Sequence, residues 1–214
     1  YADLDRHARS IAARLATSGK PGDRALLLHP SGPEFVTAFL GCLYAGIIAV
    51  PAYPPRSDKH LGRLRAIVAD AQATLVLTGQ DLDLPGTEVV LTDQLPDASD
   101  DWSAPDFPDV ALLQYTSGST GNPKGVVLTH GNLLGNLKLL ADSIAHGRDP
   151  KFVSWLPLFH DMGLIAMLLQ AFWWGAECVV MPPAAFLQKP IRWLRAISEH
   201  GGTVSGAPNF AYDL

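Results

Sequence analysis

Apolar side chains in the first half of the chain alternate between helical and strand spacing. Leu4 and Leu15 belong to a helical pattern, with Asp3 as the expected N-cap and Gly19 as the stop. Short apolar runs predict strands at residues 24–28, 47–50, 74–77 and 89–91. Helical spacing between these runs predicts one helix ending near residue 46 and another over residues 61–71. This alternation predicts an α/β fold, with β-sheets flanked by α-helices.

The second half of the chain continues the same order of elements. The predicted strands are residues 110–115, 126–129, 152–155, 178–181 and 203–205. The predicted helices are residues 132–144, 164–173 and 190–199, with Pro190 in the first position of the last one. A further helix is expected to begin at Pro208. Ser31 and Glu34 have the spacing of a capping box ahead of the helix that ends near residue 46.

Residues 93–109 interrupt the apolar pattern. They contain six Asp and three Pro in seventeen residues, with almost no apolar periodicity. Such a composition is typical of a surface linker. The sequence therefore predicts two α/β halves, residues 1–92 and 110–214, joined by this acidic, Pro-rich segment.

Composition and charge narrow the classes of function. The chain is 48% hydrophobic and carries a formal net charge of -5, with its basic residues scattered. Scattered basic residues argue against nucleic acid as a partner. The apolar stretch at residues 164–174 is shorter than the ~20 residues of a membrane-spanning helix, so no stable membrane insertion is expected. Cys42 and Cys178 are expected to be buried free thiols, and the N-terminal charges indicate a cytoplasmic protein.

A Gly- and hydroxyl-rich segment, YTSGSTGNPKG, lies between the strands predicted at residues 110–115 and 126–129. Glycines let backbone N–H groups approach an anion, hydroxyls donate hydrogen bonds, and a lysine adds positive charge. The candidate phosphate-binding residues are Thr116, Ser117, Gly118, Ser119, Thr120, Gly121, Lys124 and Gly125.

The spacing of this segment differs from the Walker A loop. Lys124 follows Gly118 by six residues, and a glycine stands where Walker A has Ser or Thr. Pro123 opposes an immediate helix, so the loop is predicted to bind phosphate from a hairpin. A plain Ser/Gly-rich turn with an exposed lysine is the alternative interpretation.

The segment YTSGSTGNPKG resembles the phosphate-loop signature of the adenylate-forming superfamily, which includes acyl-CoA synthetases, adenylation domains and luciferases. The stretches GCLYAGIIAVPAYPPR, SWLPLFHDMGLI, FLQKPIRWLRAIS and APNFAYDL are most similar to fatty-acyl-AMP ligases. The resemblance implies the N-terminal, AMP-binding part of that fold, truncated and without the small C-terminal domain. It also implies that a fatty acid reacts with ATP, assisted by Mg²⁺, and that the acyl group then passes to an acyl carrier protein.

The resemblance also implies roles for individual residues. Lys124 and His160 would be catalytic, with His160 beside the substrate carboxylate and the α-phosphate. His160, Met162, Gly163 and Phe210 would line the acyl pocket. Asp161 could bind Mg²⁺ or substrate, or could anchor the backbone of its own loop, which is the role that we favour. No metal ligand is assigned within these 214 residues, because the acidic Mg²⁺-binding motif of the family is expected downstream.

Other functions share some of these features. An acyl-CoA synthetase or an amino-acid adenylation domain would carry the same loop with a different acceptor or substrate. A binding module for nucleotide or acyl groups without catalysis is a third possibility, which the density of phosphate donors in the loop disfavours.

Overall fold

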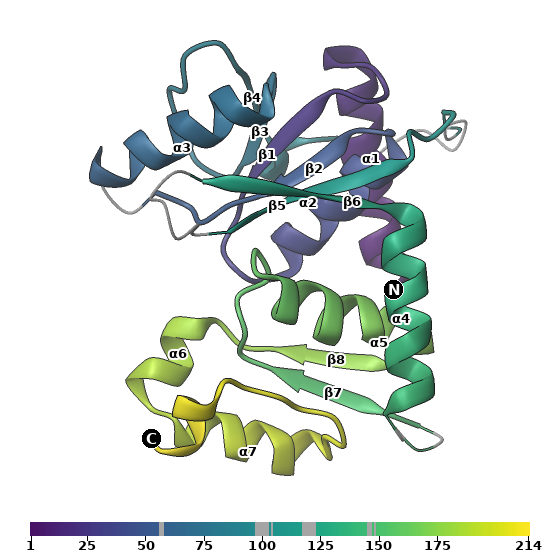
Figure 1. Cartoon of the computed structure of the whole chain (residues 1–214), viewed down its shortest axis with the longest axis vertical. Coiled ribbons are helices and arrows are strands. Elements are labelled where there is room, and N and C mark those ends of the chain that lie inside the picture. The colour runs from purple at the N-terminus through teal and green to yellow at the C-terminus, as the bar shows by residue number, and fades with distance from the viewer. Residues whose placement is uncertain (56–57, 97–102, 104, 117–122, 145–146, 148) are drawn as a thin grey trace. The chain divides into compact units, whose positions relative to one another are not determined.

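The structure is a computed structural model, and it describes residues 1–55, 58–96, 103, 105–116, 123–144, 147 and 149–214. The chain forms two compact units, Tyr1–His130 and Gly131–Leu214. Figure 1 shows the helices and strands of both units with their labels.

The first unit is built on one sheet. In the part of the chain that the structure describes, its strands follow the order β4-β3-β1-β2-β5-β6. They are β1 (Arg24–Leu28), β2 (Ile48–Pro51), β3 (Leu75–Thr78), β4 (Glu88–Leu91), β5 (Val110–Thr116) and β6 (Lys124–Thr129). Neighbouring strands pair in parallel except β5 and β6, which form an antiparallel hairpin. Parallel strands with intervening helices confirm the predicted α/β class.

Helices cover both faces of this sheet (Figure 1). Leu26, Val50 and Val76 form one core cluster with Leu64 and Ile67 of α3 (Asp58–Ala71). Because side chains alternate across a strand, the intervening residues point to the opposite face, where α1 (Ala2–Ser18) and α2 (Pro33–Tyr44) pack together. These two helices approach closely because Gly41 has no side chain. A Cβ at that position would lie 2.6 Å from Cγ2 of Ile11.

The second unit surrounds a pair of parallel strands, β7 (Lys151–Ser154) and β8 (Glu177–Val180). Its helical elements are α4 (His130–Ser143), a π-helical segment Met162–Leu169, α5 (Gln170–Trp174), α6 (Pro183–Gln188), α7 (Ile191–His200) and the 3₁₀ turn η3 (Asn209–Tyr212). In Figure 1, α5 and α7 lie on opposite sides of the strand pair. The core is rich in aromatic rings, with Phe152, Trp155, Phe186 and Trp193 all buried.

Several predicted elements differ from the observed ones. The strand expected at residues 203–205 is a single bridge between Val204 and Phe152. There, the hydroxyl of Ser205 donates to the Val153 carbonyl at 2.6 Å, so a side chain takes the place of a further ladder bond. The helix expected from Pro208 is the short 3₁₀ turn η3. The helix α6 was not predicted at all, because six residues are too few to show a clear helical period.

The predicted N-terminal caps were wrong, whereas Gly19 ends the first helix as predicted. The first helix begins at Ala2, so Asp3 lies in its first turn and is not its N-cap. The second begins at Pro33 after Gly32, and no side chain caps it. Ser31 and Glu34 therefore do not form a capping box. Proline at the first helical position needs no hydrogen-bond acceptor for its nitrogen, which lowers the demand for a cap.

The acidic segment at residues 93–109 does not separate two halves in the way that the sequence predicted. After the segment, β5 pairs with β2 through Ala49 and Leu112, so β5 and β6 belong to the first sheet. The division between compact units falls after His130 instead. Part of the segment also packs within the first unit, because Pro108 and the carbonyl of Asp106 lie beside Gly46.

Both cysteines are free thiols, as predicted, although Cys178 is only partly buried. Burial raises the pKa of the Cys178 thiol to about 11 and that of Cys42 further still. Among the described residues, no helix has the length and apolar character needed to cross a membrane.

His29 makes the stability of the first unit depend on pH. It follows β1, is 2% exposed, and its Nε2 lies 3.2 Å from the hydroxyl of Thr92. Burial lowers the pKa of His29 to about 4, although the charges of Glu34 and Asp93 oppose this shift. The unfolded chain therefore binds a proton between pH 6.5 and 4 that the folded chain does not, so stability falls as the pH falls through this range.

We expect the free energy of unfolding to fall by up to about 3 kcal/mol between pH 7 and pH 4 through this group. Urea titrations followed by circular dichroism at several pH values measure the loss. His29→Gln should flatten the pH dependence relative to the wild type. His7→Gln, which replaces an exposed histidine of α1, is the matched control and should keep it. An unchanged pH dependence in His29→Gln would show that other groups cause it.

Candidate functional site

The Gly-rich segment is carried by the β5–β6 hairpin, as the sequence predicted. Tyr115 pairs with Gly125, and Thr116 pairs with Lys124. The strands are longer than expected, so these four residues lie on the hairpin itself. Ser117, Gly118, Ser119, Thr120 and Gly121, the remaining predicted phosphate-binding residues, lie outside the described residues.

Thr116 and Lys124 form the last described pair of the hairpin, at the end that leads to residues 117–122. Both residues are exposed. Among the described residues, no carboxylate forms an ion pair with Lys124. A hydroxyl donor and an ammonium group therefore lie across from each other on neighbouring strands, and both are groups that can bind an anion.

Tyr115 occupies the other face of the same hairpin. Its ring packs with Leu113 against the core cluster beneath α3. Its hydroxyl donates a hydrogen bond to Oδ2 of Asp70 in α3 at 2.5 Å. Burial and the neighbouring carboxylate raise the pKa of Tyr115, so the phenol keeps its proton as a donor. This contact was not predicted, because nothing in the spacing of the two residues links them.

Packing explains why position 125 is a glycine, which the sequence did not reveal. A Cβ at this position would lie 2.9 Å from Cζ of Tyr115. The ring of Tyr115 thus lies across the backbone of β6, which only a residue without a side chain permits. Gly125 shapes the hairpin by admitting this ring.

The second group of predicted residues lies in the other unit, after β7. His160 is exposed and ends a turn in which its N–H donates to the Pro157 carbonyl at 3.1 Å. Its Nδ1 lies 2.5 Å from Oδ1 of Asp161, and the same oxygen accepts the N–H of Met162 at 2.6 Å. Asp161 thus anchors its own loop backbone, in agreement with the role that we favoured.

The carboxylate of Asp161 also holds the imidazole of His160 in place. Nδ1 of His160 lies beside Oδ1 of Asp161 and 3.4 Å from the backbone N–H of Met162, so both neighbours restrict the orientation of the ring. Both side chains are exposed, so the pair adds little to stability. Its effect is on the orientation of the imidazole.

Gly163 is required by packing at the start of the π-helical segment. A Cβ there would lie 2.2 Å from the carbonyl oxygen of Pro157. The sequence predicted a helix over residues 164–173 without distinguishing a π-helical part, because both forms place apolar residues on one face. π-Helical turns are rare and are often found at functional sites.

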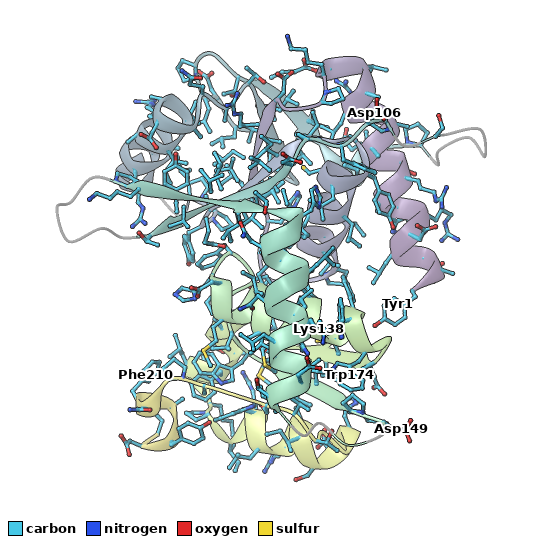
Figure 2. The ribbon with its side chains drawn as sticks, turned by 45° about the vertical axis from the view of Figure 1, so that its right-hand side comes forward. Tyr1, Asp106, Lys138, Asp149, Trp174 and Phe210 are labelled. Carbon is cyan, nitrogen blue, oxygen red and sulfur yellow. The ribbon has the colours of Figure 1, made fainter. Side chains whose placement is uncertain are left out.

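Met162 and Phe210 contribute apolar surface in the second unit. Met162 is 36% exposed, and its Cε lies 3.5 Å from the position of a Cβ on Gly206. Phe210 is 51% exposed at the edge of the unit, where Figure 2 shows its side chain. Its ring meets Trp155 edge-on at 6.2 Å, and Trp155 in turn stacks on Phe186 at 3.9 Å.

No three His, Cys, Asp or Glu side chains gather in the described part of the chain so as to hold a metal ion. Nε1 of Trp155 is buried and finds no hydrogen-bond acceptor among the described residues.

Comparison with known proteins identifies the family. The model of the AMP-binding enzyme family matches residues 1–214. The chain belongs to this family. The family assignment agrees with a hairpin that presents the hydroxyl of Thr116 and the ammonium group of Lys124 at the end that leads to residues 117–122.

Relatives of this AMP-binding chain include fatty-acid-activating enzymes. The chain is 43% identical to the medium-chain-fatty-acid–acyl-carrier-protein ligase JamA of Moorena producens, covering 100% of this chain and 39% of that protein. It is 40% identical to a long-chain-fatty-acid–AMP ligase of Mycolicibacterium smegmatis, covering 100% and 37% respectively. The chain thus spans about two fifths of the curated relatives that it matches.

A solved structure with ligands shows the same fold. The fatty acyl-adenylate ligase of L. pneumophila, in complex with acyl adenylate and pyrophosphate, matches with a TM-score of 0.90 and 42% identity. The match covers 98% of this chain and 39% of that one. The resemblance to fatty-acyl-AMP ligases and the assignment to the N-terminal part of the adenylate-forming fold are therefore confirmed.

The close approach at Gly163 leads to a test of packing in the second unit. We expect Gly163→Ala to lower the free energy of unfolding by about 3 kcal/mol, because a backbone carbonyl occupies the space of the new methyl group. Gly135→Ala in α4, where nothing lies within 4 Å of the added Cβ, is the control and should raise it by about 1 kcal/mol. Urea unfolding followed by tryptophan fluorescence measures both. Equal stabilities of the two variants would contradict the observed packing.

Proposed function

We propose that this chain is the ATP-phosphate-binding part of a fatty-acyl-AMP ligase. In the proposed reaction, a fatty carboxylate attacks the α-phosphate of ATP and forms acyl-AMP with release of pyrophosphate. The acyl group then passes to the phosphopantetheine thiol of an acyl carrier protein, and AMP leaves. The hairpin that places Thr116 opposite Lys124 is the observation that carries the proposal. The similarity to two fatty-acid ligases supports the choice of substrate.

The hairpin residues are proposed to hold the β- and γ-phosphates of ATP. Two anions must meet in this reaction, so positive charge and oriented donors lower the barrier by neutralising and positioning them. Lys124 supplies a charge without a carboxylate partner among the described residues, and Thr116 supplies a hydroxyl. Ser117, Gly118, Ser119, Thr120 and Gly121 are proposed to complete the phosphate-binding loop, with Gly125 admitting the ring of Tyr115 beneath it.

His160 is proposed to act beside the carboxylate and the α-phosphate. The contact between Nδ1 and Asp161 orients the imidazole. Met162, Gly163 and Phe210 are proposed to border the acyl chain. The exposed apolar surfaces of Met162 and Phe210 suit a hydrocarbon ligand.

Mg²⁺ is the metal expected for ATP chemistry in this family. The described residues contain no cluster of side chains that would hold it, so no step is assigned to the metal here. The free thiols of Cys42 and Cys178 suit a reducing compartment, and we propose the cytoplasm as the location.

The proposed reaction can be tested in the full-length protein. Incubation with ATP, Mg²⁺ and fatty acids of several lengths should yield acyl-AMP and pyrophosphate, detected by mass spectrometry and by pyrophosphate exchange. Adding holo-carrier protein should then give the acylated carrier, whereas adding CoA should give little acyl-CoA. Efficient acyl-CoA formation would favour an acyl-CoA synthetase. Exchange that depends on amino acids would favour an adenylation domain.

Lys124→Ala tests the phosphate site directly. We expect kcat/KM for ATP in adenylate formation to fall about 100-fold, because a charged donor to a polyanion is lost. Lys138→Ala is the matched control and should leave the rate unchanged. Lys138 lies on α4 (Figure 2) in an exposed ion pair with Asp142. Loss of activity in both variants alike would point to an effect of charge or folding that is not specific to the hairpin.

A further inference from the structure

We infer that Tyr115 and Asp70 form a clamp that holds one end of the phosphate-binding hairpin, the end that leads to residues 117–122, against α3. The clamp thereby sets the affinity of the site for ATP. The inference rests on the proposed function of the hairpin. It assigns to these two residues a positioning role that acts on ATP through Thr116 and Lys124.

The clamp lies directly at the base of the phosphate-binding segment. Tyr115 neighbours Thr116 along β5 and pairs with Gly125 across the hairpin. Its hydroxyl reaches Asp70 in α3, 45 residues earlier in the chain, at 2.5 Å. The bond therefore ties the strand ends that flank residues 117–122 to a helix on the face of the sheet.

The alternation of side chains separates the clamp from the phosphate donors. Tyr115 points to the face covered by α3, where its ring packs with Leu113 on the core cluster. Its neighbour Thr116, and Lys124 opposite, point to the other face. Tyr115 thus holds the backbone that carries Thr116 and Lys124, while its own side chain lies on the opposite face of the sheet from theirs.

The position of Asp70 is unfavourable for α3 taken alone. Asp70 is the second-last residue of the helix, and the chain turns at Gln72 with a positive φ of 53°. Unpaired carbonyls give the C-terminal turn of a helix a partial negative charge, which a carboxylate there opposes. The side chain of Asp70 is exposed, and the hydrogen bond from Tyr115 gives its carboxylate a partner within the fold. Hydrogen bonds to a charged group are stronger than those between neutral groups.

Gly125 completes the arrangement. The ring of Tyr115 fills the space next to the Cα of Gly125 in β6, and its hydroxyl bonds to Asp70 of α3. Two paired residues of the hairpin and one residue of α3 thus have complementary properties at one point: Tyr115 is the donor, Asp70 is the acceptor, and Gly125 has no side chain.

The test is steady-state kinetics of adenylate formation by the full-length protein at varied ATP. Tyr115→Phe removes only the hydroxyl, and we expect KM for ATP to rise about tenfold with kcat within about twofold of the wild type. That ratio is expected if the free energy of one hydrogen bond to a charged group serves to hold the hairpin in the form that binds ATP. A raised KM with an unchanged kcat is the signature of lost positioning that acts equally on the bound state and the transition state.

Further variants separate the clamp from general stability. Asp70→Ala should raise KM as Tyr115→Phe does, and the double variant should add little more, because both remove the same bond. Asp70→Asn keeps an acceptor and should rescue most of the effect. Tyr44→Phe is the matched control. It removes another Tyr–Asp bond of the same unit, from Tyr44 to Asp5 at 2.9 Å between α2 and α1, and should leave KM for ATP unchanged.

The outcomes distinguish this inference from the proposed function. If the wild type makes acyl-AMP but Tyr115→Phe and Asp70→Ala keep its KM for ATP, the clamp is overturned and the function stands. If Tyr44→Phe raises KM equally, the clamp is also overturned. If the wild type makes no acyl-AMP, the function fails and hydrogen exchange decides the clamp. In that case Tyr115→Phe should speed amide exchange in β6 more than Tyr44→Phe does, and equal exchange would overturn it.

Discussion

The arrangement of the first unit depends on the pairing of β5 on both of its edges. On one side β5 continues the parallel sheet from β2, and on the other it turns back as an antiparallel hairpin with β6. Parallel pairing holds β5 in the core of an α/β sheet, whereas the hairpin partner β6 has only one strand neighbour. The Gly-rich segment is thus attached to a rigid sheet at its base, while Thr116 and Lys124 face solvent at the edge. Anion sites gain from such a base, since the donors need little rearrangement to meet the ligand.

The core of the second unit is packed differently. Its sheet has two strands, β7 and β8, in the described part of the chain, and stacked and edge-on aromatic rings around Trp155 and Trp193 fill the core. The turn that carries His160 leads into the π-helical segment, where Gly163 touches the Pro157 carbonyl. A wider helical turn and a missing side chain together allow the backbone to pass this carbonyl. The catalytic candidate His160 is therefore presented by a tightly packed turn, and Asp161 orients its ring.

Local chemistry explains which elements were predictable. Strands β1 to β3 are short apolar runs bounded by turn residues, and they were found within a residue or two. The hairpin was also found, because Pro123 opposes a helix after the Gly-rich segment. The predicted boundary between the two halves was misplaced, because the acidic, Pro-rich composition of residues 93–109 marks only a change of surface character. Composition does not show whether the next strand returns to the same sheet, and β5 does return, by pairing with β2.

The sequence by itself determined the α/β class, the hairpin, the family and the residues with suitable chemistry, since these depend on local periods and on a contiguous motif. Only the tertiary structure decided which distant residues support that motif. The bond between Tyr115 and Asp70, and the space that Gly125 leaves for the ring, join segments whose spacing in sequence carries no pattern. Contacts between elements arise from the packing of whole faces, so no single stretch of sequence contains them.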